Sequence, residues 1–407
     1  MPTSDRSRRV LPVLLMLLTV FGPISMDLYL PALPALTREL EASTSLAQLT
    51  VTACLVGLAL GQLIAGPLSD RHGRRPVLLV GISTYVVASA LCATSPTIEV
   101  LLGARLLQGL AGGAGVVIAQ AAGRDVYTGG ALIRFYGRLT VMGGLAAVIG
   151  PLIGGQLSTV TDWRGLFLFL AIIGILILIA SATLFPETLP PAARSMGGFR
   201  RTVGGFRLLV ADQVFVGAAL NQGFIYAAVF AYLAGATFVL QGIYGLSPQG
   251  YSFAFGLNSI GVISFGYIAG RMAERWSIRG TLVIGIATTG AGALGLLAAG
   301  LSHVPLWVVI CSLFALASGA AITSPPATTI AMSDYPRLAG TASSLVGMAR
   351  YGFGGIAAPF VGIAGAATVL PLGIVTTTVV VLAAGAFIFT TRPRRPTWRQ
   401  DDASASR

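Results

Sequence analysis

The sequence lacks lysine altogether, and charged residues of every kind make up only 10% of its 407 residues. All 26 basic residues are therefore arginine. Without a lysine the chain holds no Walker A loop, in which a lysine reaches the phosphates of a nucleotide, and this excludes an ATPase within the chain. Hydrophobic residues make up 55% of the sequence. The mean hydropathy of +0.83 indicates a surface that faces lipid more than water.

Residues that bind metals or form disulfides are also scarce. The two histidines, His72 and His303, fall on opposite sides of the predicted membrane topology, and no HExxH motif is present. The sequence therefore offers no catalytic cluster for a membrane enzyme. The three cysteines, Cys54, Cys92 and Cys311, lie singly within predicted spans, where cysteine packs as a small apolar residue. We expect no metal site, no cofactor and no enzymatic activity.

Long stretches without charge predict an all-α integral membrane protein. A helix needs about 20 apolar residues to cross roughly 30 Å of hydrocarbon, and the sequence accommodates twelve such transmembrane helices. We expect the first to be an uncleaved span, because no small-residue cleavage site closes its apolar run as in a signal peptide. The expected spans are residues 10–33, 45–69, 76–95, 97–122, 132–157, 164–185, 212–239, 248–270, 280–301, 304–331, 337–361 and 367–390.

The positions of the arginines predict how these helices cross the membrane. With twelve spans both termini lie on one side, and twenty-two arginines fall on that side. Only Arg38 and Arg164 fall on the other. Basic residues concentrate in cytoplasmic loops, so we expect a multi-pass protein of the inner (cytoplasmic) membrane with both termini in the cytoplasm. Topology and anionic lipid headgroups account for the net charge of +12, which calls for no nucleic acid.

A charged loop occurs at equivalent places in the two halves of the sequence. The stretch GPLSDRHGRR (66–75) follows the second span, and GRMAERWSIR (270–279) follows the eighth, 204 residues later. Parallel repeats of six helices are a common plan in transporters, with the substrate site where the repeats meet. We therefore expect two parallel-repeat six-helix bundles in a monomeric chain. The expected divisions are a first bundle at 1–188, a basic cytoplasmic linker at 189–211, a second bundle at 212–390 and a disordered cytoplasmic tail at 391–407.

Small residues recur at every fourth position in two of the predicted spans. They run from Ala53 to Ala65 in the second span and from Ala339 to Gly347 in the eleventh. Faces of this kind let two helices approach closely in lipid. We therefore expect the second and eleventh spans to touch.

The first charged loop is a candidate latch between the two bundles. Asp70 would lie at the start of the eleventh span, where the helix dipole favours a carboxylate. Arg71 or Arg74 would pair with Asp125, just past the fourth span. The alternative is that these arginines only set the orientation of the chain in the membrane, since basic residues concentrate in cytoplasmic loops. That tendency does not explain Asp70 or the paired glycines. The candidate latch residues are Gly66, Asp70, Arg71, Gly73, Arg74 and Asp125.

Several motifs resemble those of the major facilitator superfamily. GPLSDRHGRR resembles its signature loop between the second and third spans, and RLLQG (105–109) resembles its fourth-span motif. The fifth span resembles the superfamily's antiporter motif, with alanine at position 146, where glycine is usual. The resemblance implies a bend that seals one side against leak, and ordinary close packing is the alternative. The residues of this motif are Gly150, Pro151, Gly154 and Gly155.

Further motifs resemble the Bcr/CflA group of bacterial drug:proton antiporters. The resemblance covers nearly all of residues 10–390 and is denser in the first half. It implies the major facilitator fold and proton-coupled export of amphipathic drugs or antibiotics by alternating access. It does not name the drug. The motifs are MDLYLPALP (26–34), AGRDVY (122–127), DWRGLF (162–167), FPETL (185–189) and AGTASSL (339–345).

Two ionisable residues within the predicted spans are candidates for proton coupling, because such residues are costly in a membrane. Asp27 lies about 10 Å from the outer end of the first span, and Arg105 lies about 12 Å into the fourth. Their similar depth allows them to pair or to compete. Desolvation disfavours the charged form of a carboxyl group, so we interpret Asp27 as the proton carrier and Arg105 as the charge that tunes it. A static structural ion pair is the alternative.

A third intramembrane charge, Arg350, lies near the middle of the eleventh span, with no acidic residue of the second half at comparable depth. Substrate contact and structural hydrogen bonding are both open for it. Aromatic and amide side chains of the seventh and eighth spans suit amphipathic drugs, although aromatic residues in spans also face lipid or fill cores. The expected substrate-binding residues are Asn221, Phe224, Tyr226, Phe230, Asn258 and Arg350.

We therefore expect proton-coupled drug efflux, with protons and small drug-like molecules as partners and the lipid bilayer as surroundings. The first alternative is a transporter of an endogenous metabolite, proton-coupled or facilitated, with the same fold. The second is a membrane enzyme, against which the missing catalytic cluster argues. The third is a receptor or scaffold, which would not need Asp27 and Arg105 inside the membrane.

Overall fold

The fold is entirely helical over the part of the chain that the computed structural model describes. Within those ranges no strand occurs, and ten helical stretches are long and apolar enough to cross a membrane. The all-α membrane fold predicted from the sequence is confirmed. The described residues are 5–127, 149–194, 206–302, 304–332, 339–362 and 368–390, with the single positions 135, 138, 139, 142, 146 and 335.

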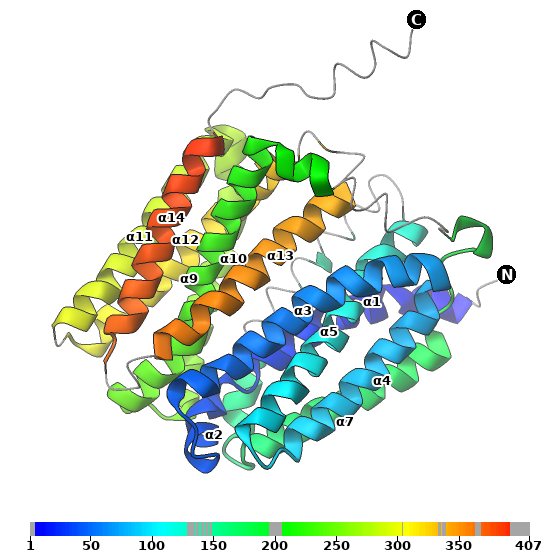
Figure 1. Ribbon diagram of the computed structural model, residues 1–407, viewed down its shortest axis with the longest axis horizontal. Helices are drawn as coiled ribbons and strands as arrows, with labels where there is room; N and C mark the ends of the chain where they lie inside the picture. The colour runs from blue at the N-terminus through cyan, green and yellow to red at the C-terminus, as the bar shows by residue number, and fades with distance from the viewer. Residues whose placement is uncertain are drawn as a thin grey trace, which may run out of the picture.

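The first five long helices form one group, hereafter the first group, at the lower right of Figure 1. α5 lies at its centre, in contact with α1, α3 and α4. Residues 149–157 add a helical segment, whereas most of the expected fifth span, 132–157, lies outside the described residues. The long helices of the first group are α1 (Asp5–Asp27), α3 (Thr44–His72), α4 (Arg74–Ala93), α5 (Ile98–Val126) and α7 (Trp163–Leu184).

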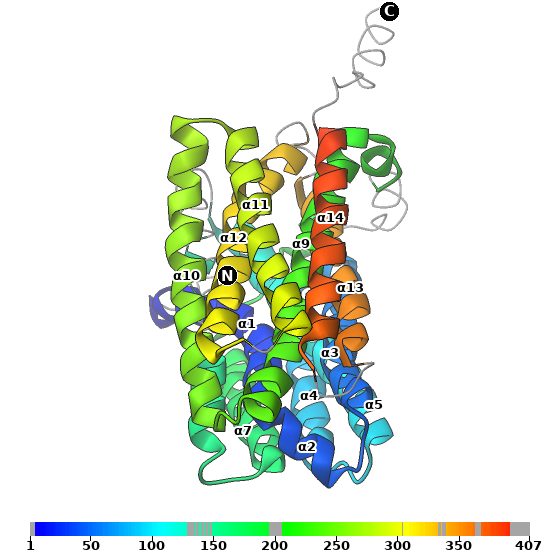
Figure 2. The same cartoon turned by 90° about the vertical axis from the view of Figure 1, so that its left-hand side faces the viewer.

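Six further helices form the second group, at the upper left of Figure 1. α9 lies at its centre, in contact with α12, α13 and α14. Figure 2 shows that the long helices of both groups run along one common direction. The helices of the second group are α9 (Gln213–Phe238), α10 (Pro248–Arg275), α11 (Ile278–Leu301), α12 (Leu306–Met332), α13 (Ala339–Ala357) and α14 (Leu370–Thr390).

In the described part of the chain, most arginines of the helix ends and loops lie at one end of the helices, hereafter the arginine-rich end. There α3 turns into α4 between His72 and Arg74, and α10 turns into α11 between Arg275 and Ile278. The two charged loops of the sequence therefore make equivalent helix–turn–helix connections in the two groups. The boundaries expected for the two bundles and the linker stay predictions, and the expected tail, 391–407, lies outside the described residues.

The first expected span, 10–33, is not one continuous helix. α1 ends at Asp27, and a 3-10 turn, η1 (Leu30–Ala32), and a short helix, α2 (Leu33–Glu39), follow it. Pro31 lacks the backbone N–H that would donate to the Asp27 carbonyl four residues earlier, which favours a break here, although α1 itself continues through Pro12 and Pro23. The break leaves Asp27 at a helix end inside the protein.

Six hydrogen bonds join the two groups in the described part of the chain, all toward the arginine-poor end. These bonds close the boundary between the groups at the arginine-poor end in this conformation. The bonds run from Ser45 Oγ to the Pro359 carbonyl (3.3 Å), Gln48 Nε2 to Ala234 (3.4 Å), Thr52 Oγ1 to Gly355 (2.8 Å), Gln241 Nε2 to Pro31 (2.9 Å), Gln249 Nε2 to Gly155 (3.1 Å) and Ser252 Oγ to Pro151 (2.7 Å).

The second and eleventh spans touch, as expected, but not through the small residues of the second. α3 and α13 lie side by side (Figure 1), and Thr52 Oγ1 donates to the Gly355 carbonyl. Gly57 and Gly61 face α5 instead. A Cβ at Gly57 would lie 2.2 Å from the Leu106 carbonyl oxygen. The expectation that these glycines face the eleventh span is wrong, because they let α3 approach α5 within the first group.

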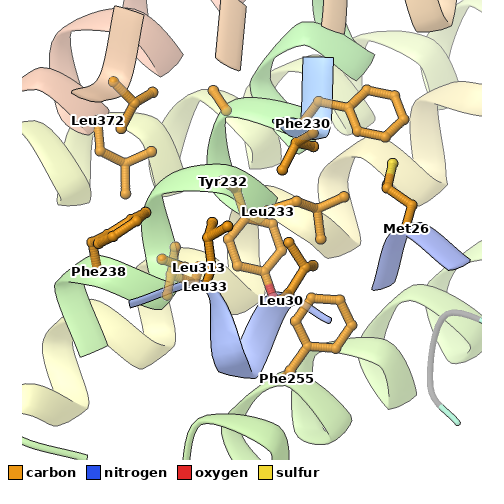
Figure 3. Close-up of a cluster of buried hydrophobic side chains, with 14 of the residues drawn as sticks. Met26, Leu30, Leu33, Phe230, Tyr232, Leu233, Phe238, Phe255, Leu313 and Leu372 are labelled. Carbon is orange, nitrogen blue, oxygen red and sulfur yellow. The ribbon is translucent and has the colours of Figure 1, made fainter. Parts of the chain in front are cut away.

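Apolar packing accompanies the hydrogen bonds between the groups. Figure 3 shows Leu30 and Leu33, from η1 and α2, beside Tyr232 of α9. Both leucines are fully buried. The segment that follows the break in α1 therefore packs into the second group, although it belongs in sequence to the first.

A disulfide should report the contact between α3 and α13. In a protein without Cys54, Cys92 and Cys311, the pair Val56→Cys and Gly355→Cys should cross-link on mild oxidation. The reason is that a Cβ at Gly355 would lie 3.4 Å from Val56 Cγ2. Mass spectrometry of the linked peptides measures the yield.

The matched control pairs Gly355→Cys with Val80→Cys. Val80 lies on α4 and is 67% exposed, so this pair should stay unlinked. Equal yields from the two pairs, or no link in the first, would contradict the packing described here.

Candidate functional site

Asp27 lies where α1 breaks, and its side chain is only 5% exposed. Two glycines of the helical segment 149–157 pack against the chain at Asp27 and Leu28. A Cβ at Gly150 would lie 3.0 Å from Asp27 Cβ, and one at Gly154 would lie 1.8 Å from the Leu28 carbonyl oxygen. Only glycine lets two backbones approach this closely. The antiporter motif thus forms one wall of the Asp27 environment.

Arg105 lies in the interior of the first group with no exposed surface. Its Nη1 donates to the Ser25 carbonyl (3.1 Å) and to Gln108 Oε1 (2.5 Å). Its Nε donates to the Thr50 carbonyl (3.4 Å), and its Cζ lies 4.3 Å from the centroid of the Tyr29 ring. Carbonyl oxygens, an amide and an aromatic face therefore stabilise this buried charge.

Asp27 and Arg105 do not form an ion pair in this conformation. The ion pairs between described residues do not include one between them, and Asp27 Oδ1 has no hydrogen-bond partner in the same part of the chain. A static ion pair therefore does not describe this conformation.

The antiporter motif also contacts the second group. Ser252 Oγ donates to the Pro151 carbonyl (2.7 Å), and Gln249 Nε2 donates to the Gly155 carbonyl (3.1 Å). A Cβ at Gly155 would lie 2.1 Å from Ser252 Oγ. The motif therefore lies between Asp27 and α10, at the closed end of the boundary between the groups. This position favours the interpretation of the motif as a seal over packing within one bundle.

The charged loop forms a hydrogen-bonded network inside the first group. Arg74 is 4% exposed, and its Nε donates to Asp125 Oδ2 (2.9 Å). Its Nη1 donates to Asp70 Oδ1 (2.5 Å) and Ser69 Oγ (2.8 Å). Of the two arginines considered for Asp125, Arg74 makes the ion pair, whereas Arg71 is exposed.

Glu187 completes this network, and sequence reasoning noted it only as a letter of the motif FPETL. Its carboxylate accepts hydrogen bonds from the backbone N–H groups of Arg74 (2.9 Å) and Arg75 (3.2 Å). These groups open α4, where the helix dipole favours a negative charge. Gly73 has a φ of +99°, and a Cβ there would lie 2.4 Å from Glu187 Oε2. Only glycine fits this turn.

Among the described residues, the partners of the charged loop lie in the first group or, like Glu187, directly after α7. Gly66 lies on α3, and a Cβ there would lie 3.6 Å from Val117 of α5. Asp70, whose side chain is 48% exposed, bonds to Arg74. Asp70 is expected beside residues 337–340, of which 337 and 338 lie outside the described residues. A contact with the eleventh span therefore stays a prediction.

Three of the expected substrate-binding residues come together in the second group. Arg350 Cζ of α13 lies 4.5 Å from the centroid of the Tyr226 ring of α9. The Phe230 ring is 6.2 Å from that of Tyr226 and 5.9 Å from that of Tyr351. Arg350, Tyr226 and Tyr351 are half-buried. This arrangement of one cation among aromatic rings can hold an aromatic ligand.

The other three expected residues serve different contacts. Asn221 has no exposed surface and donates to the Ala383 carbonyl of α14 (2.9 Å). Asn258 is buried and donates to Tyr232 Oη (3.0 Å). Phe224 lines an apolar groove of about 430 Å³ between α9, α13 and α14. These side chains pack or join helices in this conformation, apart from the cluster around Arg350.

Comparisons with known proteins agree with this geometry. The family model described as Major Facilitator Superfamily matches residues 15–359. An MFS-type transporter of Bacillus subtilis is 39% identical over 96% of this chain and 98% of its own. Multidrug resistance protein D of Escherichia coli is 31% identical over 84% and 86%, and a chloramphenicol resistance protein of Pseudomonas aeruginosa is 30% identical over 80% and 77%. A D-xylose–proton symporter structure has the same fold, with a TM-score of 0.76 at 13% identity over 95% and 97% of the chains.

Gly155→Ala should loosen the closed end of the molecule. The added methyl group would lie 2.1 Å from Ser252 Oγ, so α10 has to move away from the antiporter motif. We expect several-fold faster hydrogen–deuterium exchange in residues 248–256. Gly103→Ala is the control, because a Cβ at Gly103 meets nothing within 4 Å. Unchanged exchange in Gly155→Ala would show that the motif does not hold this contact.

Arg74→Gln should destabilise the first group. It leaves the Asp125 carboxylate, 16% exposed, without its cation, and breaking a largely buried pair costs on the order of 3 kcal/mol. Thermal unfolding in detergent should therefore occur at a lower temperature. Arg71→Gln, at an exposed arginine of the same loop, should leave unfolding unchanged. Equal effects of the two substitutions would contradict the network.

Proposed function

Because the chain belongs to the Major Facilitator Superfamily, whose model spans residues 15–359, we propose that it exports amphipathic drugs or antibiotics in exchange for protons. The relatives named for multidrug and chloramphenicol resistance support this proposal. The observation that carries it is Asp27, a buried carboxyl group at the break of α1, beside the boundary between the two groups. Among the described residues it is the one carboxylate that lies well inside an expected span.

Alternating access would expose Asp27 to one side of the membrane at a time. The hydrogen bonds at the arginine-poor end close that side in the present conformation, so proton exchange would run toward the arginine-rich end. Opening the arginine-poor end would reverse this access. Proton binding depends on how dry the carboxyl group is and on which charges lie nearby. A drug or a shift of α1 that changes the separation of Asp27 and Arg105 would therefore couple drug to proton.

We place the arginine-rich end in the cytoplasm, with both termini there. Twenty-two arginines at that end against two at the other support this orientation. The present conformation then opens toward the cytoplasm and is the one that loads a drug for export. The location would be the inner membrane of a bacterium. One chain supplies both groups and the boundary between them, which supports a monomer.

The substrate would bind between the groups, with Tyr226, Phe230 and Arg350 on the wall of the second group. Tyr226 and Arg350 offer a stacking surface and a hydrogen-bond donor. The charged loop around Arg74 would be the conformational latch. Its partners within the first group give it a fixed shape from which Asp70 can engage the eleventh span when the arginine-rich end closes.

Asp27→Asn should abolish proton-coupled efflux, because the amide cannot exchange a proton, while folding and drug binding survive. Asp27→Glu retains the titrating group on a longer side chain and should keep partial activity. The measurement is drug-induced release of a preformed pH gradient in inverted vesicles, with chloramphenicol among a panel of drugs. Vesicles of the opposite orientation should respond much less if the arginine-rich end is cytoplasmic.

Glu99→Gln is the matched control, because Glu99 lies in the first turn of α5 and is exposed. It should behave as the wild type does. If Asp27→Asn still exchanges protons for drug at near the wild-type rate, the proton carrier lies elsewhere. If no drug of the panel dissipates the gradient in the wild type, the proposed function is wrong.

A further inference from the structure

Arg350 carries a positive charge inside the second group that no carboxylate of that group's spans balances. It lies roughly 16 Å along α13 from Ala339. A charge at such a depth needs compensation from its surroundings. The acidic residues of this half before the C-terminal tail are Asp212, Glu274 and Asp334. Asp212 precedes α9 and Glu274 lies in the last turn of α10, and Asp334 lies outside the described residues.

Asp212 already has other partners. It accepts hydrogen bonds from the Val214 N–H (2.9 Å) and from the Tyr335 hydroxyl (2.7 Å). Burial, with the Asp212 carboxylate adding to it, raises the pKa of Tyr335, so its hydroxyl remains a donor at physiological pH. This carboxylate therefore caps α9 and holds Tyr335, and Arg350 forms no ion pair with another described residue.

Neutral groups hold one edge of the Arg350 guanidinium. Nε donates to Gln222 Oε1 (2.6 Å), and Nη2 donates to Ser324 Oγ (2.8 Å). Gln222 is itself fixed, since its Nε2 donates to the Ser324 carbonyl and to Thr328 Oγ1, each at 2.8 Å. The guanidinium is therefore preoriented, while its Nη1 has no hydrogen-bond partner among the residues that the structure describes.

An aromatic surface lies next to this preoriented cation. The Tyr226 ring faces the guanidinium, and Phe230 connects it to Tyr351. Arg350 and both tyrosines keep exposed surface. An aromatic ligand can stack on these rings while an electronegative substituent reaches Nη1.

We propose that Arg350 selects substrates whose aromatic ring carries a planar two-oxygen group, a carboxylate or a nitro group. The inference rests on the proposed function and specifies its substrate class. Because Nε and Nη2 already donate to Gln222, Ser324 and Thr328, Nη1 is the donor that remains for the oxygens of such a group, which can lie in the plane of the guanidinium. The oxygens of such a substrate accept from Arg350, which no carboxylate in the spans of the second group does. A lipophilic cation without such a group is disfavoured beside the positive charge of Arg350.

The test compares three ligands that differ in one substituent. They are chloramphenicol, its analogue with a carboxylate in place of the nitro group, and its analogue with hydrogen there. Wild-type protein in nanodiscs should bind the first two about tenfold or more tightly than the third, because hydrogen bonds to a charged group are strong. In Arg350→Gln and Arg350→Ala this preference should vanish, and Arg350→Lys should keep part of it.

Arg271→Gln is the matched control. Arg271 also lies over a tyrosine ring, 4.4 Å from the centroid of Tyr267, but at the arginine-rich end of α10, and its loss should leave the preference unchanged. Three results would overturn the inference: wild-type protein that binds the ligands alike or binds none, Arg350→Gln that keeps the preference, or Arg350 variants that lose all three ligands equally. The vesicle assay separates these from failure of the proposed function, because it responds to any drug of its panel.

Discussion

The centre of the molecule depends on the break that ends α1 at Asp27. Pro31 has no backbone N–H to donate to the Asp27 carbonyl, which weakens a continuing helix at this point. The carbonyl groups near the break are then free to accept other bonds, and that of Pro31 accepts from Gln241 of the second group. The glycines of the antiporter motif approach the same turn until Gly154 lies directly against the Leu28 carbonyl. The proposed proton site, the antiporter motif and the contact between the groups therefore meet at one break in one helix.

The charged loop lies at the opposite, arginine-rich end, where ion pairs and charged hydrogen bonds hold it. Arg74 binds Asp70 and Asp125, and Glu187 binds the start of α4, so the charges are satisfied within the first group. Such a network ties α3, α4 and α5 to the chain that leaves α7. In this conformation the loop is therefore held by the first group itself, without a contact to a described residue of the second group.

The sequence was sufficient to predict the helices, because membrane spans need long apolar runs, and to predict the ion pair of Asp125. It did not predict which face of α3 meets which neighbour. A small-residue stripe such as that at Gly57 says that a helix approaches closely, but not which one. Nor did it predict Glu187, which contacts α4 from 113 positions away in the sequence. It grouped Asn221 with Arg350 by residue type, whereas the direction of each side chain separates them.

The closed end is held by weak, replaceable bonds, and this suits a transporter. All six hydrogen bonds between the groups run from uncharged side chains to backbone carbonyls. Each contributes about 0.5–1.5 kcal/mol net, since water can take its place, so together they amount to roughly 3–9 kcal/mol. Reversing a two-state population from 1:99 to 99:1 takes about 5.5 kcal/mol of differential binding. Exchange of a drug for a proton can supply a free energy of that size, whereas a boundary of buried ion pairs would resist opening far more strongly.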